Sequence, residues 1–230
     1  MQKKFVLLAC LLLVASAGLA QQAAQIGPGV GQFVPTGTSC SNGGAILIST
    51  PPDQVNGLFS DVDCQLCGTG QQSIAHEFTL PAGGNVSELI VLGGYFSTNT
   101  PPGGETFRVL IHNDGGTAPG SNVSDEAGIT PDSITQTGTI LFGVNELELV
   151  LTINPVLLAA GTYWLEVFNE TADPDDDWFW ETGSPLDPNA GLSTFATETP
   201  GVTWNAQGNA FAVTICDGPI PVELIGVDVE

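Results

Sequence analysis

The stretch SIAHEFTL at residues 73–80 decides the fold class of this chain. Successive side chains of an extended strand point to opposite faces, so the even-numbered residues from Ile74 to Leu80 share one face. That face is mainly apolar, whereas Glu77 and Thr79 belong to the other. The alternation predicts a β-strand that buries one face in a core.

The same kind of pattern recurs outward along the chain, most clearly in ELELVLTI at residues 146–153. The predicted strands cover residues 45–49, 73–80, 86–96, 106–112, 133–142, 146–153, 163–168, 177–182 and 211–216. We expect a bulge at Gly93–Gly94 and a long loop at residues 50–72. No window after the N-terminal segment has a helical period. The sequence therefore predicts an all-β chain that folds as a single antiparallel β-sandwich, jelly-roll-like, with eight to ten strands.

The N-terminal segment has the three parts of a secretory signal peptide. Lys3 and Lys4 precede a short apolar run, and small residues end at Ala20. The alternatives are an uncleaved anchor helix, for which the run is short, and lipoprotein processing at Cys10. We expect a signal peptide at residues 1–20 and a secreted or cell-surface protein.

The rest of the chain is expected to contain one folded domain between two flexible segments. The predicted ranges are a flexible leader at 21–44, the β-sandwich at 45–217 and a proline-bounded tail at 218–230. No apolar stretch in these ranges is long enough for a membrane span.

The charge of the chain excludes one class of partner. It has three Lys+Arg against 25 Asp+Glu, and two of the basic residues belong to the signal peptide. Arg108 then remains as the one Lys or Arg side chain, and we expect it to pair with a carboxylate on a neighbouring strand. Such a surface repels phosphate backbones, so no nucleic acid is expected as a partner. It is compatible with divalent cations.

Four cysteines remain after signal cleavage, an even number that favours two disulfides in an exported protein. Three pairings are open, and we favour Cys40–Cys216 as a clasp between the ends of the domain and Cys64–Cys67 as a local clip. A zinc site is an alternative, but only one C-x-x-C pair is present. A redox-active C-x-x-C is another, but Gly68 to Gly70 follow it where a helix is expected.

An acidic segment is the candidate metal site. Ca²⁺ takes six to eight oxygen ligands, and an Asp-rich loop of an exported protein can supply them. The candidate ligands are Asp173, Asp175, Asp176, Asp177 and Asp187. The alternative is a solvated acidic loop without a metal.

Two tryptophans follow this segment and form the candidate ligand-stacking site. Trp178 and Trp180 share one face of a strand, where two exposed indoles would stack on sugar rings. Tyr163, Trp164 and Trp204 are further candidates. The alternative for Trp178 and Trp180 is plain core packing.

Several short motifs resemble those of a group of secreted bacterial β-sandwich proteins of unassigned role. The motifs are residues 56–61, Cys64-x-x-Cys67, 71–75, 94–96, 158–166 and 178–181, together with Ile220-Pro221-Val222-Glu223-Leu224, which is similar to junctions near the C-termini of exported bacterial proteins. The resemblance implies a β-sandwich and an extracellular address. It implies no catalytic residue.

The residues themselves predict no catalytic residue either. His76 and His112 are the only histidines, and no G-x-S-x-G turn accompanies them. The favoured interpretation is a non-catalytic secreted or cell-surface β-sandwich protein for adhesion, structure or ligand binding, with an extracellular glycan or protein as partner. The alternatives are a Ca²⁺-assisted carbohydrate-binding module and an extracellular hydrolase. Ca²⁺ is the one candidate cofactor.

Overall fold

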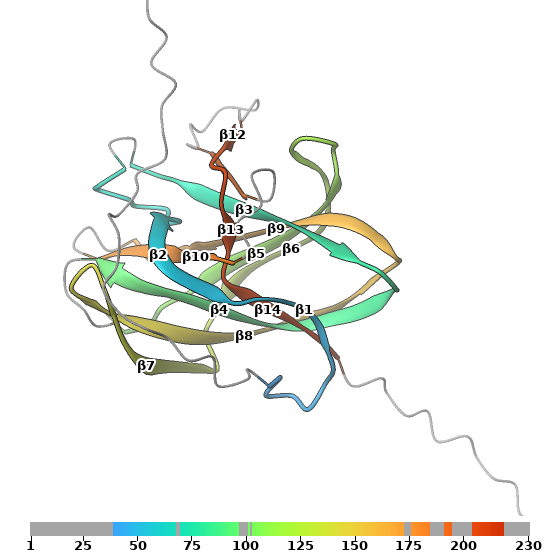
Figure 1. Ribbon diagram of the computed structural model, residues 1–230, viewed down its shortest axis with the longest axis horizontal. Helices are drawn as coiled ribbons and strands as arrows, with labels where there is room; N and C mark the ends of the chain where they lie inside the picture. The colour runs from blue at the N-terminus through green and yellow to red at the C-terminus, as the bar shows by residue number, and fades with distance from the viewer. Residues whose placement is uncertain are drawn as a thin grey trace, which may run out of the picture.

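The structure, a computed structural model, describes residues 39–67, 70–96, 101, 103–172, 176–184, 191–194 and 204–218. These residues form two antiparallel β-sheets that pack against each other, which confirms the predicted β-sandwich (Figure 1). The predicted signal peptide, leader residues 21–38 and tail residues 219–230 lie outside the described residues. In the described part of the chain, no helix has the length and hydrophobicity needed to cross a membrane.

The larger sheet has eight strands arranged around β4. It contains β1 (Ile46–Thr50), β2 (Pro52–Phe59), β4 (Gly84–Phe96), β7 (Ser133–Leu141), β8 (Val144–Leu158), β10 (Asp177–Gly183), β13 (Ala210–Phe211) and β14 (Val213–Asp217). On one side β4 pairs with β8, which pairs in turn with β7. On its other side β4 pairs with β14 along its first half and with β10 along its second. Beyond these, β1 pairs with β14 and β2 with β10.

The smaller sheet has six strands in the order β12-β11-β3-β9-β5-β6. Their bounds are β3 (Ser73–Leu80), β5 (Phe107–Asp114), β6 (Pro119–Ile129), β9 (Gly161–Asn169), β11 (Gly191–Thr194) and β12 (Asn205–Ala206). The β3–β4 and β8–β9 connections pass from one sheet to the other at the same end of the sandwich, on the right in Figure 1.

The core lies between the sheets and uses the apolar faces that the alternation predicts. Ile74, Phe78 and Leu80 of β3 belong to the same buried cluster as the leucines at 147, 149 and 151 of β8. Burying each such side chain stabilises the fold by roughly 1.5–3 kcal/mol. His76 shares this face, and its Nδ1 accepts a hydrogen bond from the Phe211 backbone N–H at 3.3 Å. His76 is therefore a core residue with a partner.

The described residues contain 14 strands, more than the eight to ten predicted. The loop predicted at 50–72 is wrong for Pro52–Phe59, which form β2. This segment starts with proline, and Gln54 has a left-handed φ of 59° beside a register shift, so no regular alternation marks it. β6 was also not predicted, because it is a largely exposed edge strand with polar residues on both faces.

The bulge predicted at Gly93–Gly94 is also wrong. The pairing of β4 with β10 covers both residues, and its pairing with β8 reaches Gly93, with no register shift at either glycine. A Cβ on Gly93 would lie 2.1 Å from the Phe179 carbonyl oxygen, and one on Gly94 would lie 2.9 Å from the Phe179 ring. The two glycines let Phe179 pack directly against the β4 backbone.

Both predicted disulfides are present. Cys40–Cys216 joins the chain before β1 to β14, and Cys64–Cys67 closes a local loop after β2. The sulfurs are bonded to each other, so they are not the free thiolates that the zinc alternative requires. The bonds are compatible with an oxidising compartment.

The two disulfides should differ in their effect on stability. Cys40–Cys216 spans 176 residues and Cys64–Cys67 spans 3. In the chain-entropy model, replacing both cysteines by serine lowers the free energy of unfolding by up to about 5 kcal/mol for the long loop and about 2 kcal/mol for the short one. Urea unfolding followed by tryptophan fluorescence measures both losses. Equal losses in the two double variants would contradict the clasp assignment.

Candidate functional site

The two tryptophans predicted to stack on a ligand lie in the core. Trp178 and Trp180 are fully buried, with ring centroids 5.1 Å from Phe107 and 5.3 Å from Phe211 respectively. The stacking prediction is therefore wrong for this pair, because no part of either indole faces solvent. Aromatic side chains bury large apolar areas, which favours a position between the two sheets.

The acidic segment predicted to bind Ca²⁺ is described only in part. Asp173, Asp175 and Asp187 lie outside the described residues, whereas Asp176 and Asp177 are buried. The carboxylate of Asp177 accepts hydrogen bonds from the backbone N–H groups of Gln65 and Leu66, at 2.9 and 3.0 Å. Both of its oxygens therefore hold the Cys64–Cys67 loop, and Asp177 has a structural role.

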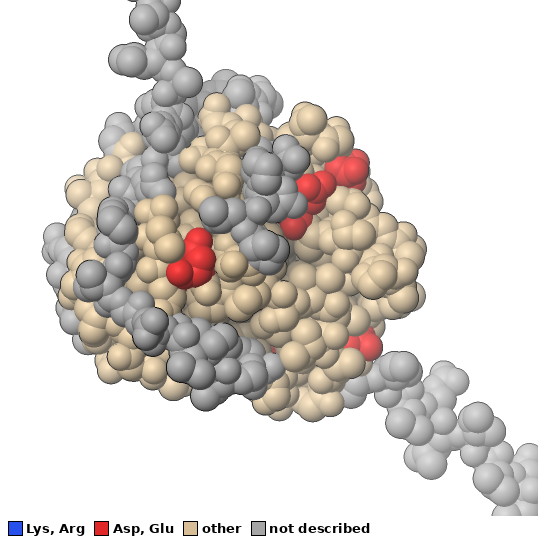
Figure 2. All heavy atoms as spheres, viewed as in Figure 1, with Lys and Arg blue, Asp and Glu red and all other residues tan. Residues whose placement is uncertain are grey.

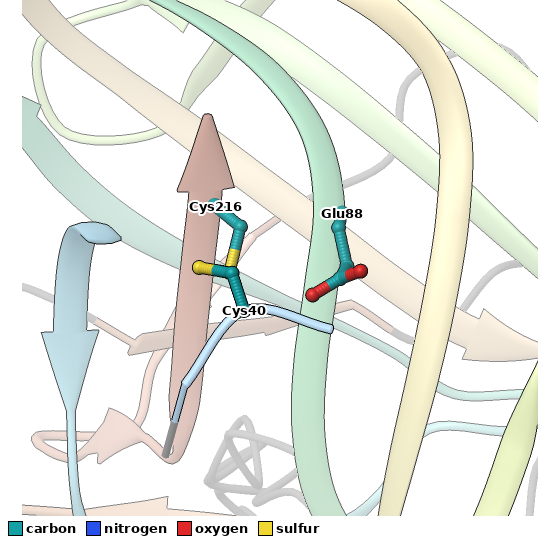
Figure 3. Close-up of side chains that lie close together, drawn as sticks. All are labelled: Cys40, Glu88 and Cys216. Atoms are coloured by element: carbon teal, nitrogen blue, oxygen red, sulfur yellow. A yellow bond between two sulfur atoms is a disulfide. The ribbon is translucent and has the colours of Figure 1, made fainter. Parts of the chain in front are cut away.

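A second group with metal-ligand chemistry lies at the long disulfide. Figure 3 shows Glu88 of β4 beside Cys40 and Cys216. The two sulfurs are joined in the disulfide, so they are not thiolate ligands. The Glu88 carboxylate accepts hydrogen bonds from the Ser41 and Asn42 backbone N–H groups at 2.7 and 3.0 Å, and from the Ser41 hydroxyl. This group fixes the start of the domain onto β4.

Two buried carboxyl groups have strongly raised pKa values. Burial is the main cause at Asp61, whose pKa rises to about 7 although backbone N–H groups of Asp63 and Trp178 donate to it. Burial, followed by the charge of Glu146, raises the pKa of Glu181 to about 10. Both groups therefore favour the neutral carboxyl form inside the fold.

A polar and aromatic cluster lies on the face of the six-stranded sheet that points away from the core. Leu165 and Val167 of β9 and Ile111 of β5 face the core, so their neighbours in sequence point outward. The cross-strand register places Glu166 beside Leu110 and Trp164 beside His112. We call this outer cluster the outer-face site; its residues are Ser73, His112, Asp114, Trp164, Glu166 and Trp204.

Glu166 is the centre of the outer-face site. Its two oxygens bind different partners: the Ser73 hydroxyl donates to one, and His112 Nε2 lies 2.9 Å from the other. All three side chains are buried. The other ring nitrogen of His112, Nδ1, is buried and has no hydrogen-bond partner among the described residues. Buried polar atoms without a partner are uncommon in folded proteins, which marks this face as unusual.

The aromatic half of the outer-face site continues from His112. Trp164 is buried and packs with Ala75, and Trp204 lies partly exposed against this pair. The indole N–H of Trp164 lies 3.4 Å from a carboxylate oxygen of Asp114, which is exposed at the end of β5. An indole, a carboxylate and an imidazole therefore meet on one sheet face.

The outer-face site is not arranged as a serine nucleophile triad. In such a triad the imidazole accepts the serine proton and the carboxylate lies behind the imidazole. Here the Glu166 carboxylate lies between Ser73 and His112. The hydroxyl therefore has no imidazole base, and the geometry is that of a positioned polar surface.

The sequence indicated this site only in part. Trp164 and Trp204 were predicted as candidate aromatics, and His112 was noted as one of two histidines. Ser73 and Glu166 were missed because they come from β3 and β9, which are far apart in the chain and adjacent only in the sheet. The sequence signal for Glu166 was its charged side chain within the mainly apolar strand Gly161–Asn169.

The charges of the described surface are dispersed. Arg108 forms a two-point ion pair with Asp125 of β6, at 2.7 and 2.8 Å, which confirms the predicted cross-strand pairing. The hydrogen bonds from Arg108 lower the pKa of Asp125. On the face drawn in Figure 2, Asp and Glu of the described residues occupy a few separate places and the other described surface is uncharged.

No protein-family model matches this chain, and no curated protein matches its sequence. Function is therefore inferred from the geometry of the sites.

The raised pKa of Asp61 predicts a pH dependence of stability. The folded pKa of about 7 lies above the ordinary value of 3.8, so the folded state retains a proton that the unfolded state loses between these values. Its contribution to stability is largest at the acidic end and is lost as the pH rises through about 7. The urea midpoint of Asp61→Asn should therefore fall less steeply than that of the wild type between pH 4.5 and 8. Asp125→Asn is the control and should leave the slope unchanged; equal slopes for Asp61→Asn and wild type would contradict the assignment.

The two core tryptophans predict a difference between matched substitutions. Trp180 Nε1 donates to the Ala212 carbonyl at 2.8 Å, whereas Trp178 Nε1 has no partner among the described residues. Both changes to Phe remove a similar area, but only Trp180→Phe loses a hydrogen bond. We expect it to be about 1 kcal/mol more destabilising than Trp178→Phe in urea unfolding. The reverse order would contradict the hydrogen-bond assignment.

Proposed function

We propose that this chain is a non-catalytic extracellular β-sandwich module that binds a neutral carbohydrate at the outer-face site. The observation that carries the proposal is the meeting of Trp204, Trp164, Asp114 and the Ser73–Glu166–His112 group on a sheet face that does not belong to the core. The disulfides and the signal-like N-terminus support the extracellular part.

The chemistry of the outer-face site favours a sugar. A sugar ring presents an apolar face that packs on an indole, and hydroxyl groups that hydrogen bond to carboxylates and amides. Trp204 supplies a partly exposed indole, and Asp114 supplies an exposed carboxylate at the end of β5.

The charge of the chain favours a neutral sugar over an anionic one. Arg108 is the one Lys or Arg after residue 20, and its guanidinium already binds Asp125. A carboxylated or sulfated glycan would have to approach acidic side chains without an unpaired cation to bind.

Two substitutions test this function. A glycan array should identify a neutral ligand for the purified chain, and titration calorimetry should then show binding at least tenfold weaker for Trp204→Ala, and weaker for Asp114→Asn. Tenfold corresponds to about 1.4 kcal/mol, a usual contribution of one aromatic contact. Leu157→Ala is the matched control, because Leu157 is 82% exposed on β8 of the other sheet. Binding that is unchanged in Trp204→Ala, or an array without any neutral ligand, would refute the proposal.

A further inference from the structure

A second group of buried polar side chains lies in the other sheet and takes no part in the outer-face site. Leu147 of β8 and Trp180 of β10 belong to the core cluster, so Glu146 and Glu181 point to the opposite face of the eight-stranded sheet. Both glutamates are fully buried. Gln54 of β2, which is 7% exposed, completes the group.

Gln54 connects the two carboxyl groups. Its side-chain Nε2 donates to Glu146 at 3.0 Å, and its backbone N–H donates to Glu181 at 3.1 Å. The Thr137 hydroxyl donates to the second oxygen of Glu146, and Thr139 Oγ1 lies 3.4 Å from Gln54 Nε2. Four strands, β2, β7, β8 and β10, therefore direct oxygen-bearing side chains to one point.

Two acceptor atoms in this group have no partner. Gln54 Oε1 and Glu181 Oε2 are both buried and make no hydrogen bond among the described residues. Each is an oxygen that can ligate a cation. The amide oxygen only accepts, whereas a neutral Glu181 carboxyl can instead donate its proton to the neighbouring Glu146. The unpartnered amide oxygen of Gln54 is evidence independent of the two glutamates, because Gln54 is uncharged and is more than nine-tenths buried beside them.

Within the part of the chain that the structure describes, no positive side chain pairs with the two carboxyl groups. The ion pairs of the described residues involve Arg108 and His112, and neither contacts Glu146 or Glu181. Two adjacent buried carboxyl groups are both ionised only where a positive charge lies between them. A bound cation is one way to supply that charge.

We propose that Glu146, Glu181 and Gln54 bind a Ca²⁺ ion. The carboxylate and amide oxygens are ligands of the kind that Ca²⁺ takes, and the Thr137 and Thr139 hydroxyls contact the same group of side chains. A protein-only oxygen cage suits Ca²⁺ better than Mg²⁺, which usually retains several waters. The site uses none of the candidate ligands of the acidic segment at residues 173–177. Because four strands form it, the ion binds the folded chain and stabilises it.

Calcium titration of the whole chain tests this site. After treatment with EDTA and transfer to chelator-free buffer, calorimetry should show Ca²⁺ binding, and added Ca²⁺ should raise Tm by several degrees while the same concentration of Mg²⁺ raises it less. Glu181→Gln should bind Ca²⁺ at least tenfold more weakly and lose the shift in Tm. Gln resembles a protonated carboxyl group in shape, so this variant should fold without the ion.

Two further variants decide between this site and others. Glu88→Gln is the matched control, since Glu88 is a buried carboxylate of the same sheet that binds Ser41 and Asn42, and it should bind Ca²⁺ as the wild type does. Gln54→Leu, which removes the amide oxygen at similar size, should weaken binding as Glu181→Gln does. Wild-type binding that is retained in both Glu181→Gln and Gln54→Leu, or that is lost in Asp175→Asn instead, would overturn the proposal. So would the absence of binding at millimolar Ca²⁺.

Discussion

The burial of β10 on both of its faces is the constraint on which the rest of the structure depends. All seven residues from Asp177 to Gly183 are buried. Trp178 and Trp180 fill the space between the sheets, while Phe179 and Glu181 are covered on the opposite face. A strand buried on both sides has little access to water, so its polar groups depend on neighbouring residues for hydrogen bonds. Trp178 Nε1 and Glu181 Oε2 are left without a partner among the described residues.

Residues next to β10 leave space for its side chains and form hydrogen bonds with its polar groups. Gly93 and Gly94 of β4 leave space for Phe179, and Asp177 takes the backbone N–H groups of the Cys64–Cys67 loop. The backbone N–H of Trp178 donates to Asp61, and the backbone of Gln54 donates to Glu181. The Cys64–Cys67 loop, the two glycines and the buried acids therefore all contribute to the packing of β10 in this sheet.

The six-stranded sheet differs, because its outer face has become the polar and aromatic surface proposed to bind a ligand. The core face of β9 contains Tyr163, Leu165 and Val167, yet the outward residues Trp164 and Glu166 are buried as well. Burial of a carboxylate costs free energy unless it is hydrogen-bonded, and Ser73 and His112 provide those bonds. Because this burial costs free energy, ligand binding explains the arrangement better than fold stability alone.

The sequence by itself determined the fold class and most strands, and it favoured the observed disulfide partners among three possible pairings. Alternation at residues 73–80 and 146–153 reports side-chain direction, which is a local property of an extended backbone. Only the tertiary structure decided which residues of distant strands meet on the same face of a sheet. The alternation alone is compatible with Trp178 and Trp180 as a binding platform or as core residues, and the positions of β4 and β13 make them core residues. Ser73, Glu166 and His112 meet only through the register of β3, β9 and β5. The same holds for Gln54, Glu146 and Glu181, since hydrogen bonds and ion sites depend on distances of about 3 Å that sequence spacing does not encode across strands.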